Sequence, residues 1–320
     1  DITGFQNEDG KISAGDSNAA LLSFFARVNY DYDNKYLLSL SIRRDESSKF
    51  HKDNRVGYFP SVPAGWNVHQ EKWFQNPVMS KLKIRASYGE LGANFLNPYN
   101  FDAIAYGPIP YTVGGERYVT GRAAYLKSKD LKWETAKTTD IGIELGFFNN
   151  DLTLSLDYFV KKNVDLLAQI DLNLSSGQIF EINSSREKPY VNTASVKNTG
   201  WEFMMNYRKQ LTKDFHIDAT FNIATLKNKV LSLGENVQPI TSGAMSSYFN
   251  DAASITMPGE AIGSFYGYKI DGFDAEGNFI FADTDKNGVV NANDKVILGS
   301  PIPDFTYGLN INMEYKDFDL

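Results

Sequence analysis

The sequence predicts an all-β protein whose strands each have one apolar and one polar face. Side chains alternate between apolar and polar along many short stretches, for example 215–223, and this period of two is that of a β-strand. The 18 Tyr and 22 Phe among 320 residues are also typical of strands. No stretch approaches the ~18 consecutive apolar residues of a membrane-spanning helix, and the mean hydropathy is −0.35. A helical membrane protein is therefore excluded.

Composition narrows the class of protein further. The chain has no Cys, which excludes a disulfide framework and a thiolate metal site. Its formal net charge of −7 argues against a general nucleic-acid binder. The first residues, 1–6, have neither the basic start nor the apolar core of a signal peptide. We therefore expect the chain to begin partway through a longer precursor.

The first half of the chain predicts two hairpin strands, a weaker strand, a clear strand and a long connection. In order, these are Leu22–Tyr32, a tight turn at Asp33–Lys35, a return strand from Tyr36 to Arg43, a strand over Tyr58–Val68, a strand over Lys81–Glu90, and a loop over Gly92–Asp130. The third strand is weaker because its two prolines cannot donate to a ladder of hydrogen bonds. The loop is unusually long for a compact domain.

The second half predicts a second hairpin and further antiparallel strands. The predicted strands are Asp140–Phe147, Leu152–Tyr158, Ala194–Tyr207, Phe215–Ala224 and Phe305–Tyr315. The apolar parity of the third of these slips near Asn198–Gly200, which predicts a β-bulge. Residues 226–303 are expected to be mostly loop, interrupted by a short strand over Ser264–Lys269.

Alternation alone leaves two architectures open, a soluble β-sandwich and a transmembrane β-barrel. Several stripes reach the ~9 to 11 residues that a tilted membrane crossing needs. Short and long connections alternate, and aromatic residues gather at the short-turn ends, as in outer-membrane barrels. Charged residues also fall almost entirely on one parity, and those residues are Arg27, Asp31, Arg43, Lys83, Arg85, Asp140, Glu144, Asp157, Glu202, Asp218 and Glu314. These patterns favour an antiparallel up-and-down transmembrane barrel over the sandwich.

Several sequence blocks, in a consistent order, resemble SusC/RagA-type TonB-dependent transporters of the outer membrane. The blocks are Arg27-Val28-Asn29-Tyr30-Asp31-Tyr32, Arg43-Arg44-Asp45-Glu46-Ser47-Ser48-Lys49-Phe50, Phe59-Pro60-Ser61 with Gly65-Trp66, Leu82-Lys83-Ile84-Arg85-Ala86-Ser87-Tyr88-Gly89, Leu131-Lys132-Trp133-Glu134, Asn198-Thr199-Gly200-Trp201-Glu202 and Gly299-Ser300-Pro301-Ile302-Pro303-Asp304-Phe305. The resemblance spans nearly the whole chain. Glu46 stands where the family's block has a Gly, which is a small departure.

The resemblance implies a barrel of typically 22 strands, of which residues 1–320 supply about nine, with short periplasmic turns and long extracellular loops. The plug domain, the TonB-contacting N-terminal region and the final strands are absent from the chain, which looks like a later part of the barrel domain. Residues 226–303 are expected to be a long extracellular loop region. The implied setting is the outer membrane of a Gram-negative, Bacteroidota-like bacterium, in contact with its lipid.

The implied function is TonB-dependent import of a large nutrient, an oligosaccharide or a peptide, together with a SusD-like surface lipoprotein. Two alternatives stay open, a secreted soluble β-sandwich that binds glycan and a passive porin. We expect no catalytic activity, because the three histidines His51, His69 and His216 are scattered and form no catalytic constellation. Tyr106, Tyr111, Tyr118 and Tyr125 in the long loop could stack on sugar or peptide or pack loop against loop, so the substrate-binding residues remain unknown.

Residues 283–294 match the spacing of an EF-hand-like calcium loop. In such a loop, oxygen ligands come from positions 1, 3, 5, 7, 9 and 12, and a Gly forms the sharp turn. The predicted ligands of a structural Ca²⁺ are Asp283, Asp285, Asn287, the Val289 carbonyl, Asn291 and Asp294. Asp294 is shorter than the usual Glu, and no helix is predicted beside the loop. The alternative is an ordinary solvated turn, which uses the same residue types.

Overall fold

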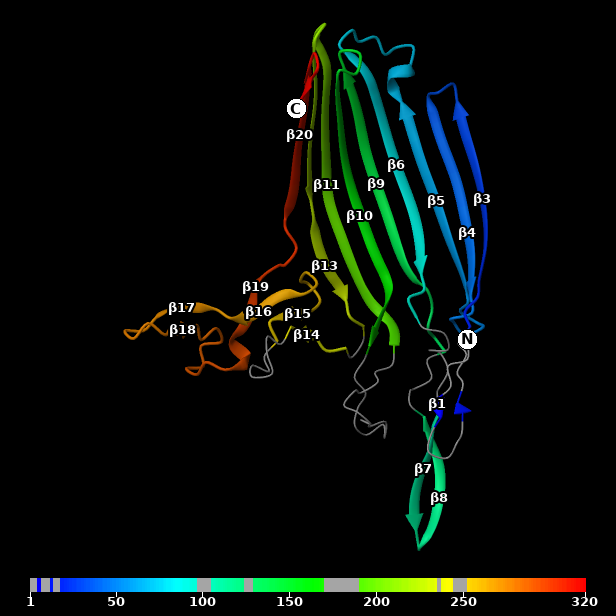
Figure 1. Cartoon of the computed structure of the whole chain (residues 1–320), viewed down its shortest axis with the longest axis vertical. Helices are drawn as coiled ribbons and strands as arrows, with labels where there is room; N and C mark the ends of the chain where they lie inside the picture. The colour runs from blue at the N-terminus through cyan, green and yellow to red at the C-terminus, as the bar shows by residue number, and fades with distance from the viewer. Residues whose placement is uncertain are drawn as a thin grey trace.

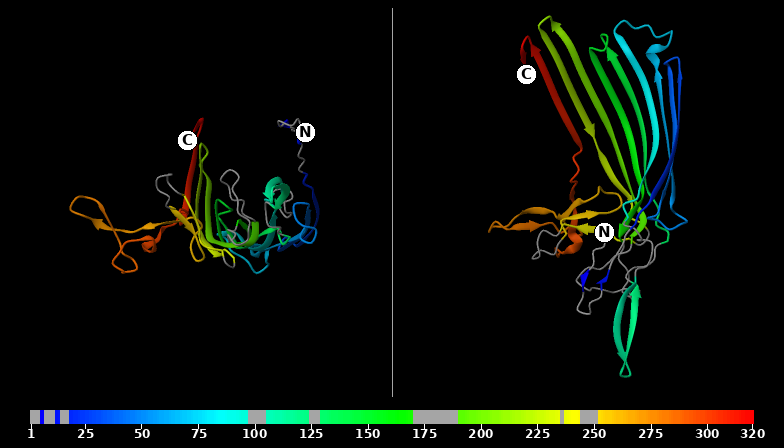
Figure 2. Two further views of the ribbon diagram at one scale, coloured as in Figure 1. Left: turned by 90° about the horizontal axis from the view of Figure 1, so that it is seen from below. Right: turned by 45° about the vertical axis from the view of Figure 1, so that its right-hand side comes forward.

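The computed structural model describes residues 5–6, 12–13, 18–96, 105–123, 129–169, 190–234, 237–243 and 252–320. Its main feature is one antiparallel eleven-stranded sheet with strand order β21-β20-β12-β11-β10-β9-β6-β5-β4-β3, in which β13 also pairs with β11. Viewed from below, the sheet is an arc rather than a closed ring (Figure 2). Among the described residues, no helix is long and apolar enough to cross a bilayer.

The long strands of the main sheet agree with the predicted stripes and are mostly longer. Their bounds are β3 Leu21–Tyr32, β4 Tyr36–Ser47, β5 Val56–Asn67, β6 Met79–Ala93, β9 Glu134–Phe147, β10 Leu152–Gln169, β11 Tyr190–Thr212, β12 Phe215–Thr225 and β20 Phe305–Tyr315. The short strands are β1 Phe5–Gln6, β2 Ile12–Ser13, β7 Ala105–Val113, β8 Glu116–Ala123, β13 Lys227–Ser232, β14 Ile240–Ser242, β15 Ser254–Thr256, β16 Ser264–Tyr268, β17 Ile270–Phe273, β18 Phe279–Phe281, β19 Lys295–Gly299 and β21 Phe318–Asp319. Two 3₁₀ turns, η1 Val68–Gln70 and η3 Ala292–Asp294, complete the described elements.

The long strands run up and down, with the tight turns at one end of the sheet and the long loops at the other (Figure 1). The first turn is tight because Asp33 and Asn34 both adopt positive φ, 55° and 53°. This is the conformation of two-residue hairpin turns, and Asp and Asn tolerate it well. Aromatic rings meet at this end, as in the stacked Tyr32 and Tyr36 rings with centroids 6.3 Å apart. The predicted segregation of turns and loops is confirmed.

Pro63 of β5 disturbs pairing with β4 as predicted, whereas Pro60 stays in register opposite Ile42. The register between β4 and β5 runs from Tyr36 opposite Trp66 to Leu38 opposite Ala64 and resumes only at Ser41 opposite Ser61. Pro63 lies in this gap. The strand nevertheless continues to Val56 along β4, because one interrupted ladder does not stop pairing on either side of it.

The connection over Gly92–Asp130 is not only loop. It contains the hairpin β7–β8, which extends away from the main sheet (Figure 1). The hairpin turns at Gly114 and Gly115, with φ of 62° and 87°. A Gly-Gly pair between two apolar stretches is a known hairpin signal, and the sequence interpretation missed it.

The bulge predicted at Asn198–Gly200 is wrong. The register of β11 with β10 is continuous there, from Lys161 opposite Asn198 to Tyr158 opposite Trp201. What changes is the other neighbour of β11, which is β12 from Glu202 onward and β13 up to Thr199. The apolar residues change faces at this point because the surroundings of the sheet change, without any extra residue.

Residues 226–303 contain more strand than predicted. A single residue separates the end of β12 from the start of β13. Because β13 pairs with β11 beyond the end of β12, it extends the main sheet. A four-stranded sheet of β14, β15, β16 and β19 and the hairpin β17–β18 follow at the loop end (Figure 1). Short strands with irregular connections carry weak periodicity, and this explains why the region was expected to be mostly loop.

Two small apolar clusters lie at the loop end of the main sheet. One contains Phe50, Phe59, Leu96, Leu131 and Trp133, all buried. It joins the β4–β5 connection to both ends of the β6–β9 connection, because Leu96 starts that connection and Leu131 ends it. The other contains Ala194, Val196, Val230 and Leu233. The buried core therefore supports the loops, whereas most of the sheet has no second layer.

Candidate functional site

The apolar face of the sheet is continuous across all nine long strands. One row of directly paired residues consists of Tyr32, Tyr36, Trp66, Ile84, Ile143, Leu156, Phe203, Ile223 and Tyr307. Five of its nine members are exposed, from 39% for Leu156 to 71% for Tyr307, and the other four are half-buried, so none is buried. A sandwich would bury such a row against its second sheet. The arrangement is instead that of a barrel wall with an apolar face toward lipid.

The neighbouring row, one residue along each strand, points to the opposite face. Its members are Asp31, Leu37, Gly65, Arg85, Gly142, Asp157, Glu202, Ala224 and Thr306. The register places all eleven charged residues of the predicted polar parity on this face. We call it the lumen face, because in a closed barrel it lines the interior.

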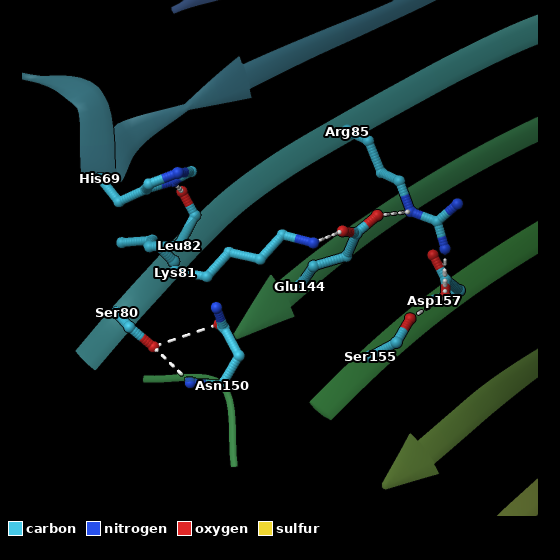
Figure 3. Close-up of polar contacts among 9 residues, drawn as sticks. All are labelled: His69, Ser80, Lys81, Leu82, Arg85, Glu144, Asn150, Ser155 and Asp157. Carbon is cyan, nitrogen blue, oxygen red and sulfur yellow. Dashed lines mark hydrogen bonds and ion pairs between the residues drawn. The ribbon is translucent and has the colours of Figure 1, made fainter. Parts of the chain in front are cut away.

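An ion-pair network on the lumen face joins three strands (Figure 3). Arg85 on β6 donates from Nη2 to Asp157 Oδ2 on β10 at 2.6 Å, so the contact passes over the intervening strand β9. Gly142 is the β9 residue between them. A Cβ at Gly142 would lie 1.8 Å from Asp157 Oδ1 and 2.9 Å from Arg85 Nε. Only glycine at this position leaves room for the pair.

Glu144 extends the network toward the turn end. Its carboxylate lies 2.7 Å from Lys81 Nζ and 3.5 Å from Arg85 Nε. Ser155 Oγ donates to Asp157 Oδ2 at 2.8 Å. Asp157 Oδ1 is buried and has no hydrogen-bond partner among the described residues. The network gives the lumen face fixed, paired charges of both signs.

A groove of about 480 Å³ lies on the lumen face of β3 to β6 near the loop end. Phe25, Arg27, Arg43, Phe59 and Leu91 line it. Phe25 is 84% exposed although it lies on the polar parity. Arg43 is held by Asp45 at 2.7 Å, whereas Arg27 has no ion pair among the described residues. The sequence placed these residues on one face but did not predict that they form a groove, because their spacing across strands depends on register.

The block that contains Glu46 splits between the two faces of β4. Arg43 pairs with Asp45 on the lumen face, and Arg44 Nη2 lies 2.9 Å from Glu46 Oε2 on the other face. Ser47 is buried, and its Oγ accepts from Asn94 Nδ2 at 3.1 Å. Glu46, the departure from the family block, thus has a local role as the partner of Arg44.

The predicted calcium loop brings its three carboxylates together. Ligand oxygens of Asp283, Asp285 and Asp294 all lie within 4.8 Å of one another. The loop is folded by its own amides, since Asn287 N and Gly288 N donate to Asp283 at 3.1 and 2.7 Å. Gly288 has φ +87°, as the sharp turn requires. Asn287, Asn291 and Val289 also lie in this loop, which ends in the 3₁₀ turn η3.

Asp294 is the organising residue of the loop. It is fully buried, and its Oδ1 accepts from Thr284 N at 2.7 Å and from Asp285 N at 3.2 Å. Its Oδ2 accepts from Asn291 N at 2.8 Å, which completes a capping box at η3. The Asn291 amide is the main cause that lowers the pKa of Asp294, so the carboxylate is charged. Three converging carboxylates of this kind fit a hard cation.

Other candidate residues are not brought together. Tyr106, Tyr111 and Tyr118 lie in β7–β8, but their side chains, like Tyr125 as a whole, lie outside the described part of the structure. The histidines are far apart in the fold, since His69 Nδ1 contacts the Leu82 carbonyl at 3.0 Å and His51 lies beside Asp53. His216 pairs with Glu314 in the sheet register.

Comparison with known families decides what kind of barrel this is. Residues 2–319 match the family model described as TonB dependent receptor-like, beta-barrel. The chain belongs to this family. TonB-dependent receptors are outer-membrane proteins, so the predicted fold and the outer-membrane location are confirmed.

Curated relatives are also TonB-dependent receptors. TonB-dependent receptor P3 of Formosa agariphila is 36% identical over 94% of this chain and 31% of the relative. TonB-dependent receptor SusC of Bacteroides thetaiotaomicron is 33% identical over 93% of this chain and 30% of SusC. The chain spans about a third of the length of these relatives, and the predicted SusC/RagA-type resemblance is confirmed.

Solved structures show the same fold. The RagAB peptide importer in its open-open state matches with a TM-score of 0.78 at 23% identity, over 97% of this chain and 32% of the other. The structure of the RagAB peptide transporter matches with a TM-score of 0.74 at 23% identity, over 94% and 32%. The chain is thus similar to TonB-dependent receptors in its three-dimensional fold as well as in its sequence.

Proposed function

We propose that this chain forms part of the wall of a TonB-dependent importer that carries a large nutrient, an oligosaccharide or a peptide, across the outer membrane. The observation that carries the proposal is the division of the single-layer sheet into an apolar face and a charged lumen face. A wall of this kind separates lipid from a hydrated passage. Because the chain belongs to the TonB-dependent receptor family, the proposal includes the TonB complex as the energy source for import.

The proposal includes a SusD-like surface lipoprotein as partner at the loop end. Support comes from the similarity to SusC and to the RagAB structures. RagAB is described as a peptide transporter, and at 23% identity this supports the fold of the chain rather than its cargo. Oligosaccharide and peptide therefore remain the two substrate classes of the proposal.

The test is uptake in cells that lack the complete receptor and are complemented with it. Labelled oligosaccharides and labelled peptides are supplied separately, with and without a functional TonB complex. We expect accumulation of one class, dependent on both the receptor and TonB. Uptake that continues unchanged without TonB would identify a passive porin, and uptake that is independent of the receptor would overturn the proposal.

We further propose that the loop 283–294 binds a structural Ca²⁺ through Asp283, Asp285, Asn287, the Val289 carbonyl, Asn291 and Asp294. The supporting observation is the convergence of three carboxylates, whose ligand oxygens lie within 4.8 Å of one another and are of the type that Ca²⁺ prefers. A bound ion would brace this exposed loop and would have no catalytic role.

Calorimetric titration of the complete receptor with Ca²⁺ tests this second proposal. Asp283→Ala and Asp285→Ala should each abolish the binding heat, whereas Asp271→Asn on β17 should leave it unchanged. Asp271 is a suitable control because it lies in the same region and outside the loop. Equal binding by all three variants and the unmodified receptor would show that the loop is an ordinary turn.

A further inference from the structure

A row of lysines crosses the lipid-facing side of the sheet at the loop end. Lys137 on β9, Lys162 on β10, Lys197 on β11 and Lys229 on β13 are directly paired neighbours. We call these four residues the lysine row. Because adjacent strands lie about 4.8 Å apart, the row extends over about 14 Å. Lys227 lies on the same face, two residues from Lys229.

The lysine row lies directly above the apolar band. The same face carries Leu152, Leu154 and Leu156 on β10, then Tyr158, and reaches Lys162 four residues later. Ten residues from Leu152 to Lys162 span about 33 Å along the strand, or about 25 Å across the membrane at a tilt of about 40°. This is the height of the apolar band of outer-membrane barrels. The lysine amines are therefore at headgroup level.

Two aromatic rings lie on the same face between the leucines of the apolar band and the lysine row. The rings of Tyr158 and Trp201 lie side by side, with centroids 4.8 Å apart and Trp201 52% exposed. Tyr88 lies on the same face one row below Glu90. Amphipathic rings such as these are enriched near membrane interfaces.

An ordinary solvated surface carries charges of both signs, whereas the four residues of the lysine row are all positively charged. Glu90 is the single acid in line with the row, and it pairs with Lys137 at 3.3 Å. Lys162, Lys197 and Lys229 have no ion pair or hydrogen-bond partner among the described side chains. The whole chain carries a net charge of −7, so a one-sign cationic row is a local departure from its composition. Three of the four lysines therefore have no counter-charge within the described sheet.

We propose that the lysine row binds the phosphate groups of a lipid in the outer leaflet of the outer membrane. The row faces outward, at headgroup height and at the end that carries the long loops. Clustered lysines beside a membrane attract anionic headgroups, and lysine amines bind phosphate as point charges. The surface thus fixes the receptor to the phosphorylated lipid around it, a contact separate from nutrient import.

The test measures binding of diphosphoryl lipid A to the complete receptor in detergent by native mass spectrometry and thermal shift. One variant combines Lys162→Gln, Lys197→Gln and Lys229→Gln. The matched control combines Lys161→Gln and Lys83→Gln on the lumen face with Lys213→Gln in a turn, which removes the same charge. Dephosphorylated lipid A and inorganic phosphate are the ligand controls.

We expect the lysine-row variant to lose about tenfold in affinity for diphosphoryl lipid A and the control variant to bind normally. Equal binding by both variants would overturn the proposal, as would equal binding of dephosphorylated lipid A. A thermal shift of the same size with inorganic phosphate alone would show a free-anion site instead. Because binding is measured without transport, this result is independent of the proposed import function.

Discussion

The close approach at Gly142 gives the sharpest structural prediction. In Gly142→Ala the new Cβ would lie 1.8 Å from Asp157 Oδ1, so the carboxylate must move away from Arg85. Arg85 and Asp157 now meet at 2.6 Å. The displaced Asp157 would be a buried carboxylate without its cation, because its side chain is only 9% exposed.

The cost follows from the exposure of the two partners. Breaking a fully buried pair costs about 3–5 kcal/mol, whereas a surface pair costs about 1 kcal/mol or less. Arg85 is 39% exposed and can reorient toward water or Glu144, so the loss falls between these limits. We expect Gly142→Ala to destabilise the sheet by about 2 kcal/mol.

The assay is the temperature at which the complete receptor loses its folded electrophoretic mobility in detergent. Gly65→Ala is the matched control, since Gly65 lies in the same row and its Cβ would come no closer than 3.4 Å to Lys83 Cε and 3.6 Å to Leu37 Cδ1. The control should melt like the unmodified protein, and Gly142→Ala should melt lower. In an Asp157→Ala background the Gly142→Ala substitution should cost less, because the atom that clashes most is gone and Arg85 Nε, 2.9 Å from the new Cβ, belongs to a flexible side chain that can shift.

Two results would refute this reasoning. If Gly142→Ala and Gly65→Ala melted alike, the pair over β9 would not depend on glycine. If Gly142→Ala cost as much with Asp157→Ala as without it, the effect would come from the strand backbone instead of the carboxylate.

Three further predictions follow from the same structure. Removal of Ca²⁺ by a chelator should speed proteolysis within 283–294, and Asp283→Ala should be cut equally fast with and without chelator. The Tyr36 hydroxyl donates to Glu71 and holds the pKa of Glu71 below its ordinary 4.5, so this link stabilises the turn at neutral pH and is lost as pH falls through the lowered pKa. Trp66, which donates to Glu71 at 3.2 Å, should report that loss by fluorescence, and Glu71→Gln should remove the acid transition. Ile143→Arg on the apolar row should cost about 2–4 kcal/mol and reduce the folded receptor in the membrane, whereas Ser87→Arg on the lumen face, opposite Asp140, should be tolerated.

Local periodicity was enough to predict the strands and their two faces. A period of two depends only on neighbouring residues, and it correctly placed Arg85 and Asp157 on one face. The ion pair between them could not be predicted, because it depends on which strands are neighbours and on the register that puts Gly142 in between. Register is a property of the assembled sheet.

The wrong and missed predictions have the same physical origin. The change of apolar face near Gly200 looked like a bulge because a single strand does not reveal that β13 replaces β12 beside it. The lysine row was missed because its members are scattered between positions 137 and 229 and meet only across the sheet. The candidate calcium loop could be recognised in the sequence because all its candidate ligands lie within 12 consecutive residues.

Accessibility of spin labels in the bilayer tests most directly whether the apolar face meets lipid. Labels are placed by Phe221→Cys, Asn222→Cys and Ile223→Cys on β12 of the complete receptor, in a stretch without native Cys. Labels at 221 and 223 should be accessible to oxygen, which concentrates in lipid, and shielded from a water-soluble nickel chelate. The label at 222 should show the reverse. The same accessibility at all three positions, or oxygen accessibility highest at 222, would contradict a barrel wall with its charged face inward.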